Sequence, residues 1–135
     1  MALNKKLEDF ENAIGRLKES YKKAKENESN NEYSFFRDST IQRFEFTLEI
    51  SWKSIKEFLL KIEGIECRSP KSCAREFFSI GYLNQDDIAL FLEMIDDRNL
   101  ATHTYHESLA EDIFSKTDSY IILLENIYKT LKENS

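Results

Sequence analysis

Hydrophobic side chains recur every three or four positions along most of this chain, which is the spacing of one face of an α-helix. The first segment shows this most clearly. Its apolar positions are Leu3, Leu7, Phe10, Ile14, Leu17, Tyr21 and Ala24. Such a narrow stripe is typical of a helix in a bundle or a coiled-coil seam. The stripe ends in the polar stretch KENESNNEYS, which predicts a loop.

The second segment, residues 35–62, has a pattern that fits two kinds of structure. Residues 44–52 (FEFTLEISW) alternate apolar and polar side chains, as a half-buried strand does. Residues 33–63 contain neither Gly nor Pro, and their apolar positions also form a helical stripe, so we favour a helix. The stripe consists of Ile41, Phe44, Leu48, Ile55, Phe58 and Leu59, widened by Phe46, Ile50 and Trp52.

A helix that is apolar over so much of its circumference must be covered on more than one side. The simplest explanation is a bundle core on one side and a second copy of the chain on the other. The alternative is a helix central to its own domain.

Turn and capping residues delimit the remaining helices. Gly64 ends the second helix, and Ser69-Pro70 places an N-cap and a first-turn proline before a short helix. Gly81 ends that short helix, and Asn84 caps the next one. The last helix is predicted over residues 108–132.

Composition agrees with a helical fold. The whole chain of 135 residues has only three Gly and one Pro. An all-β fold needs a turn about every 8–12 residues, which so few breakers do not provide. We therefore predict an all-α fold with one domain over residues 1–135. Its architecture would be an up-and-down four-helix bundle with one additional short helix, assembled as a homodimer.

Charge and cysteine content narrow the class of protein. The net charge of −6 argues against non-specific nucleic-acid binding, although it allows a local cationic site. No apolar stretch approaches the roughly 18 residues of a membrane span, so we predict a cytoplasmic protein. Cys67 and Cys73 are then expected to be reduced thiols, and two cysteines are too few for the usual zinc sites.

The sequence RNLATHTY, residues 98–105, is the strongest candidate for a site. Arg98 continues the apolar stripe of Ile88, Phe91 and Ile95, so its guanidinium should be partly buried. A buried cation needs a counter-charge. Glu45 and Glu49 are the best-placed carboxylates, and a substrate phosphate is the alternative.

His103 lies five residues after Arg98, about 140° around the helix. The two side chains can act together only if the helix breaks near Thr102 or if one of them comes from a second chain. The simpler interpretation is a helix end whose Arg and His suit the helix dipole, followed by a core tyrosine at Tyr105.

Neighbouring residues give weaker signals. His103, His106, Asp96, Asp97 and Glu107 are too loosely spaced for a full ligand set, so we predict no metal site. We expect Asp96 and Asp97 to be solvated or paired with Arg98.

The spacing Arg98-x4-His103-x-Tyr105 resembles the Arg-x4-His-x-Tyr motif of the HEPN superfamily, small helical proteins encoded beside minimal nucleotidyltransferases. The segments IQRFEFTLEISWK (41–53) and MIDDRNLATHTY (94–105) are similar to the branch called nucleotidyltransferase substrate-binding proteins. The resemblance extends over residues 7–128.

The resemblance implies a homodimeric toxin of a toxin–antitoxin pair that acts as an endoribonuclease without metal or other cofactor. It assigns catalysis to Arg98 and His103, and Asn99 would orient the RNA phosphate. It also implies that a partner minimal nucleotidyltransferase, the antitoxin, transfers AMP to Tyr105.

Two other functions remain open from the sequence. The chain is alternatively a non-catalytic subunit that presents a nucleotide to a nucleotidyltransferase, with Arg98 anchoring the phosphate. A third hypothesis is a helical dimer whose polar residues only satisfy buried charge.

Overall fold

The computed structural model describes residues 2–135, and helices account for most of them. The elements are α1 (Ala2–Glu26), α2 (Tyr33–Phe58), the π-helical turn η1 (Leu59–Glu63), α3 (Pro70–Ser79), α4 (Gln85–His103) and α5 (Glu107–Asn134). No strand occurs in the described residues. The predicted all-α bundle with one short additional helix is therefore confirmed.

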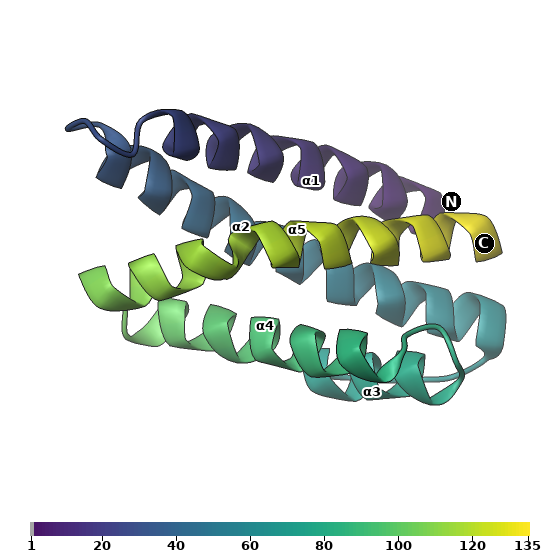
Figure 1. Ribbon diagram of the computed structural model, residues 1–135. Helices are drawn as coiled ribbons and strands as arrows, with labels where there is room; N and C mark the ends of the chain where they lie inside the picture. Colours follow the sequence, from purple (N-terminus) through teal and green to yellow (C-terminus); the bar gives the residue numbers. More distant parts are fainter. Residues whose placement is uncertain (1) are drawn as a thin grey trace.

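Helices α1 and α2 form an antiparallel hairpin, and α5 lies along both (Figure 1). Helix α4 packs against α2 and α5 on the opposite side of α5 from α1, and the short α3 packs beside it. The start of α1 and the end of α5 lie at the same end of the bundle (Figure 1).

The core confirms the stripes read from the sequence. Leu7, Phe10 and Leu17 of α1 are buried. At the centre of the bundle, Phe44 of α2 stacks on Tyr120 of α5 with ring centroids 5.3 Å apart. Full burial of one large apolar side chain contributes about 1.5–3 kcal/mol, so these contacts dominate the stability of the bundle.

Helix α2 includes the segment that resembles a strand. Two of the apparently polar positions, Thr47 and Ser51, are fully buried. Their hydroxyls donate to the backbone carbonyls of Arg43 and Leu48, both at 2.7 Å. The alternation in sequence is therefore not an alternation of burial, because small hydroxyl side chains can satisfy themselves within a helix.

The predicted capping residues occupy their expected positions. Ser69 and Ser72 form a reciprocal capping box at the start of α3, and Asn84 accepts from the backbone N–H of Asp87. Gly64 and Gly81 both have positive φ, which suits glycine after a helix. The Gly64 N–H donates to the carbonyl of Leu59, which closes the π-helical turn η1.

The prediction of reduced thiols is wrong, because Cys67 and Cys73 form a disulfide. The segment between η1 and α3 folds back so that the two Cα atoms lie 5.2 Å apart. This separation is within the normal range for a disulfide. The bond ties the start of α3 to the preceding loop. Both cysteines are buried.

Some large apolar side chains remain exposed on the described surface. Phe46 of α2 is 61% exposed and Leu100 of α4 is 49% exposed. One side of α2 is thus central to its own domain, while another is open to solvent. The homodimer stays a prediction. No helix in residues 2–135 has the length and apolar character required to cross a membrane.

Candidate functional site

The candidate site lies where α4 ends. Helix α4 continues without interruption to His103, and the N–H of Thr104 donates to the carbonyl of Leu100 at 2.7 Å. The helix therefore does not break near Thr102. Arg98 and His103 of one chain cannot be brought onto one face in that way.

Arg98 lies as its position in the apolar stripe predicts. Its side chain is 31% exposed, and Nη2 donates to Oε2 of Glu49 at 2.8 Å. Lys53 contacts the other oxygen of Glu49 at 3.3 Å. The prediction of a partly buried guanidinium with Glu49 as counter-charge is confirmed.

Glu45 has a different partner from the one expected. It accepts a hydrogen bond from the Thr102 hydroxyl at 2.9 Å rather than from Arg98. The reason is helical register, since Glu45 and Glu49 lie one turn apart on α2 and so face successive turns of α4.

Tyr105 follows α4 in the short connection to α5 and is not a core tyrosine. Its side chain is 45% exposed, and its hydroxyl donates to Oδ1 of Asp38. Burial, and then the hydrogen bond to Asp38, raise the pKa of Tyr105 well above its usual value.

These three contacts form one feature, which we call the polar seam: Asp38–Tyr105, Glu45–Thr102 and Glu49–Arg98. From one pair to the next, the residue number on α2 rises from 38 to 49 while that of its partner falls from 105 to 98. This order is the one expected for antiparallel helices. Helix α2 supplies every acceptor, and α4 with the following turn supplies every donor. The seam thus fixes the end of α4 to α2.

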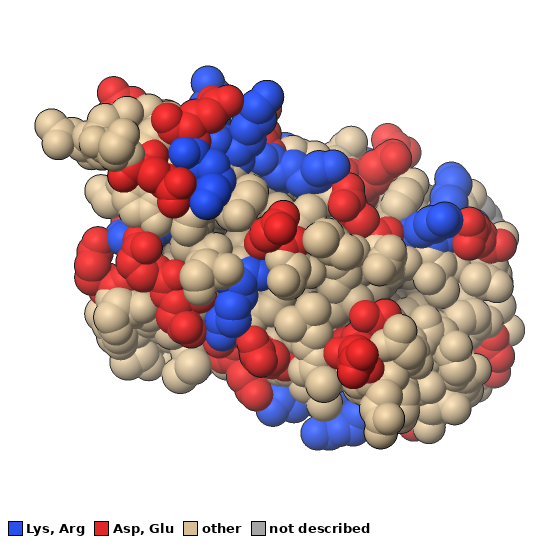
Figure 2. Space-filling view, viewed as in Figure 1, with Lys and Arg blue, Asp and Glu red and all other residues tan. Residues whose placement is uncertain are grey.

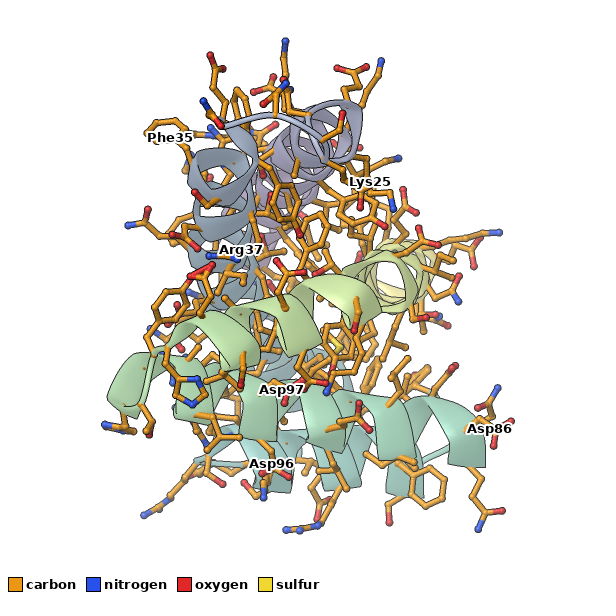
Figure 3. All side chains as sticks on the ribbon, turned by 60° about the vertical axis from the view of Figure 1, so that its left-hand side comes forward. Lys25, Phe35, Arg37, Asp86, Asp96 and Asp97 are labelled. Carbon is orange, nitrogen blue, oxygen red and sulfur yellow. A yellow bond between two sulfur atoms is a disulfide. The ribbon has the colours of Figure 1, made fainter. Side chains whose placement is uncertain are left out.

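A cluster around Arg37, which the sequence reasoning missed, supports one end of this seam. Arg37 is only 3% exposed and donates to Asp38, Glu107 and Glu111 at 3.0, 2.7 and 2.9 Å. It extends from α2 beside the start of α5 (Figure 3). The hydrogen bond from Arg37, and then its charge, lower the pKa of Glu107. A signal for Arg37 existed, since it continues the stripe of Ile41, as Arg98 continues that of Ile95.

His103 and Asn99 lie on the outer side of α4. With Asp96, Leu100 and Thr104 they line a shallow hollow. Asn99 also lines a second, smaller hollow with Arg98. The predicted catalytic residues therefore occupy adjoining faces of one helix, and Asn99 lies between them.

The two aspartates before Arg98 are engaged elsewhere. Asp96 pairs with Lys71 at 2.7 Å. Asp97 is buried and accepts from Tyr120 and from Lys116, the latter at 2.8 Å. The expectation that Asp97 is solvated or paired with Arg98 is wrong, because Asp97 faces α5.

Within residues 2–135, no group of three or more His, Cys, Asp and Glu side chains is arranged to hold a metal ion. His106 acts instead as the N-cap of α5, with Nδ1 accepting from the backbone N–H of Leu109 at 3.3 Å. Because the His106 side chain caps α5, it does not form a site together with His103.

Comparison with known protein families identifies the family of this chain. Residues 5–133 match the family described as nucleotidyltransferase substrate binding protein like. The chain belongs to this family. The resemblance to the branch called nucleotidyltransferase substrate-binding proteins is thereby confirmed.

A curated relative of this chain is named probable ribonuclease HepT, from Haemophilus influenzae. It is 26% identical over 99 residues, which cover 70% of this chain and 66% of that protein. The match thus spans slightly less than two thirds of the relative.

Solved structures agree on the fold of this chain. A protein from Thermus thermophilus is 36% identical with a TM-score of 0.71, covering 85% of this chain and 98% of its own. A tri-AMPylated Shewanella oneidensis HEPN toxin, solved with its MNT antitoxin, has a TM-score of 0.78 at 17% identity, covering 97% and 96%. A Haemophilus influenzae protein, described as the substrate-binding domain of a nucleotidyltransferase, has a TM-score of 0.77 at 20% identity, covering 93% and 98%.

Proposed function

We propose that this chain is a homodimeric HEPN toxin that cleaves RNA without a metal ion. A partner minimal nucleotidyltransferase would act as antitoxin by transferring AMP to Tyr105. The observation that carries the proposal is the end of α4, where Glu49 holds Arg98 while Asn99 and His103 line an open hollow beside it.

The proposed cleavage uses groups that these residues supply. The ribose 2′-oxygen attacks phosphorus, the bond from phosphorus to the 5′-oxygen breaks, and a cyclic phosphate results. The 5′-oxygen leaves with the electron pair and takes up a proton from water. His103 takes the 2′ proton, which suits a side chain whose ordinary pKa is about 6.5. Arg98 offers a planar fork of donors to the phosphate oxygens that gain charge. Asn99, between the two, donates to the phosphate.

A second copy of the chain would complete the site. Arg98 and His103 lie about 140° apart around α4, so one chain does not present both to the same phosphorus. Leu100 of α4 is exposed in the hollow of Asn99 and His103, and Phe46 of α2 is exposed beside α1. Both provide apolar area for an interface between copies. Two copies of α4 in one cleft would bring Arg98 of one beside His103 of the other.

RNA is expected to bind locally rather than through a broad basic surface. The net charge is −6, and acidic and basic side chains are interspersed over the face shown in Figure 2. A local site draws on few phosphate contacts, so its affinity should depend only weakly on salt.

The test is RNA cleavage in the presence of a chelator. We expect wild-type protein to cut and His103→Ala and Arg98→Ala to lose about 100-fold or more of the rate, as removal of an acid–base group does. His106→Asn is the matched control, because it removes the neighbouring histidine but keeps a capping side chain on α5. Cleavage that survives both active-site substitutions would contradict the catalytic assignment.

The alternative is a non-catalytic subunit that holds a nucleotide for a nucleotidyltransferase. The positions of Arg98 and Asn99 next to one another on α4 favour it, since both side chains can donate to a phosphate. No cleavage by wild type, together with ATP binding that Arg98→Ala abolishes in calorimetry, would support this alternative over the toxin.

A further inference from the structure

The Tyr105 hydroxyl is held more firmly than its exposed position suggests. Tyr105 lies in the connection between α4 and α5, and its ring is nearly half exposed. Its hydroxyl nevertheless donates to Asp38, a residue of α2 that is 67 positions away in the sequence. A single carboxylate oxygen therefore determines where this hydroxyl lies.

That carboxylate is itself fixed. Arg37 Nε and Nη2 donate to the same Oδ1 of Asp38 at 3.1 and 3.0 Å. The guanidinium is buried and is held from the other side by Glu107 and Glu111. The chain of contacts runs from the start of α5, through Arg37 and Asp38, to the Tyr105 hydroxyl.

We propose that Asp38 is a catalytic residue for the modification of Tyr105, accepting the hydroxyl proton as the phenol oxygen attacks the α-phosphorus of a nucleoside triphosphate. This inference rests on the proposed function. The bond from Oη to the α-phosphorus forms, and the bond from that phosphorus to the oxygen bridging to the β-phosphate breaks. Pyrophosphate leaves with the electron pair, and the proton passes from Oη to Asp38 and then to water.

The chemistry requires such an acceptor. Burial and the hydrogen bond to Asp38 raise the pKa of Tyr105, so the phenol keeps its proton at neutral pH. A neutral phenol is a weak nucleophile, and a general base within hydrogen-bond reach activates it. Asp38 already accepts the hydrogen bond from the proton that has to leave.

The other carboxylates of the cluster are engaged elsewhere. Glu107 accepts from Arg37, and Glu111 accepts from Arg37 and from the Tyr33 hydroxyl at 2.8 Å. Asp38 is therefore the carboxylate of this cluster whose contact with Tyr105 is direct.

The experiment follows AMP transfer to the chain by a partner minimal nucleotidyltransferase, with ATP and Mg²⁺, by intact-protein mass spectrometry. Asp38→Asn keeps an oxygen that can accept the hydrogen bond but no longer takes the proton. We expect its rate near pH 7 to fall about 100-fold, with the KM for the chain little changed. The rate of the variant should rise with pH as hydroxide replaces the base, and Asp38→Glu should restore part of the activity.

Two controls separate chemistry from structure. Glu107→Gln loosens Arg37 without contacting Tyr105, and Glu63→Gln alters a similar tyrosine–carboxylate pair, Tyr82–Glu63 at 2.6 Å, away from the site. Glu63→Gln should be modified at the wild-type rate, and Glu107→Gln should lose far less of the rate than Asp38→Asn. A loss with Glu107→Gln equal to that with Asp38→Asn would show a merely structural role and overturn the inference.

The outcomes also separate this inference from the proposed function. If Tyr105→Phe accepts as much AMP as wild type, or wild type accepts none, the assignment of Tyr105 fails and the role of Asp38 fails with it. If Tyr105→Phe is not modified while Asp38→Asn reacts at the wild-type rate, only the role of Asp38 is refuted.

Discussion

Arg37 and Arg98 each lie where the stripe of a helix would place an apolar side chain, yet their surroundings differ. Arg37 is almost completely buried and contacts three carboxylates. Arg98 is nearly a third exposed and has one carboxylate partner, Glu49. Arg37 is therefore an anchor whose donors are in use, whereas Arg98 keeps an exposed part that can meet a phosphate.

This difference gives a prediction for stability. Arg37→Leu leaves three carboxylates without their cation, and because they are largely solvated we expect a loss of about 2 kcal/mol in the free energy of unfolding. Chemical denaturation measures it. Arg43→Leu, which removes an arginine with an exposed carboxylate partner, should cost less than about 1 kcal/mol. Equal losses in the two variants would contradict the anchoring role.

The same cluster predicts a pH dependence. The pKa of Glu107 is lowered in the folded state by Arg37, so its ionised form stabilises the fold above the ordinary value of 4.5. This stabilisation is lost as the pH falls from about 4.5 through the lowered pKa. Thermal unfolding between pH 6 and pH 3 should therefore show a steeper decline for wild type than for Arg37→Leu. Parallel declines would contradict the assignment.

At the scale of single residues, the sequence predicts the side-chain positions that depend only on the repeat of one helix. Extending the stripe through Ile95 correctly predicted a partly buried Arg98, with Glu49 as one of two candidate carboxylates, and the same step along α2 would have found Arg37. Asp97 could not be placed in this way. Its burial depends on Tyr120 and Lys116 of α5, and the rotation of α5 against α4 is set by the packing of the whole bundle.

Among the helices, α3 has the most unusual support, because a disulfide, a capping box and an ion pair all act on its first turns. Cys67–Cys73 joins it to the preceding loop, Ser69 caps it, and Lys71 connects it to Asp96 of α4. Pro70 lines the small hollow beside Arg98. The start of α3 thus forms part of the wall of the candidate site.

We expect reduction of this disulfide to lower the free energy of unfolding by about 2 kcal/mol, as the loss of a short cross-linked loop does. Chemical denaturation with and without dithiothreitol measures the change. The double variant Cys67→Ser with Cys73→Ser is the control, because its stability should not respond to reductant. Identical curves for wild type with and without reductant would contradict the structural role of the bond.

The helices themselves were largely predictable, for reasons that differ between them. Caps such as Ser69 and Asn84 act locally, so the sequence identifies them. The strand-like alternation in α2 was resolved by the length of sequence without Gly or Pro. The pairing of Cys67 with Cys73 was not predictable, because it depends on how the loop before α3 folds back.

In the whole molecule, the polar seam fixes α4 to α2, and Leu100 leaves the surface at the end of α4 apolar and open. Phe46 leaves a second apolar position open on α2, beside α1. The bundle was predictable from sequence because its core residues recur with helical spacing. The assembly was not, since an exposed apolar side chain does not specify what covers it.

The proposed dimer gives a prediction at this scale. Phe46→Glu places a charge on the apolar surface, so we expect the protein to shift from dimer to monomer in light scattering and to lose RNA cleavage. Ile122→Glu alters a similarly exposed residue of α5 and should leave the dimer intact. A wild-type monomer, or a dimer that tolerates the Phe46 substitution, would contradict an interface through α2.

The π-helical turn after α2 has a consequence for the length of the chain. Gly64 reaches back five residues to Leu59, where an α-helix reaches back four, so the turn contains one residue more than a regular helix needs. Leu60 and Ile62 in this turn are exposed, so losing one residue there removes no core contact. We therefore expect homologous chains that are one residue shorter to have lost that residue here, with a regular α-helix running on to the glycine.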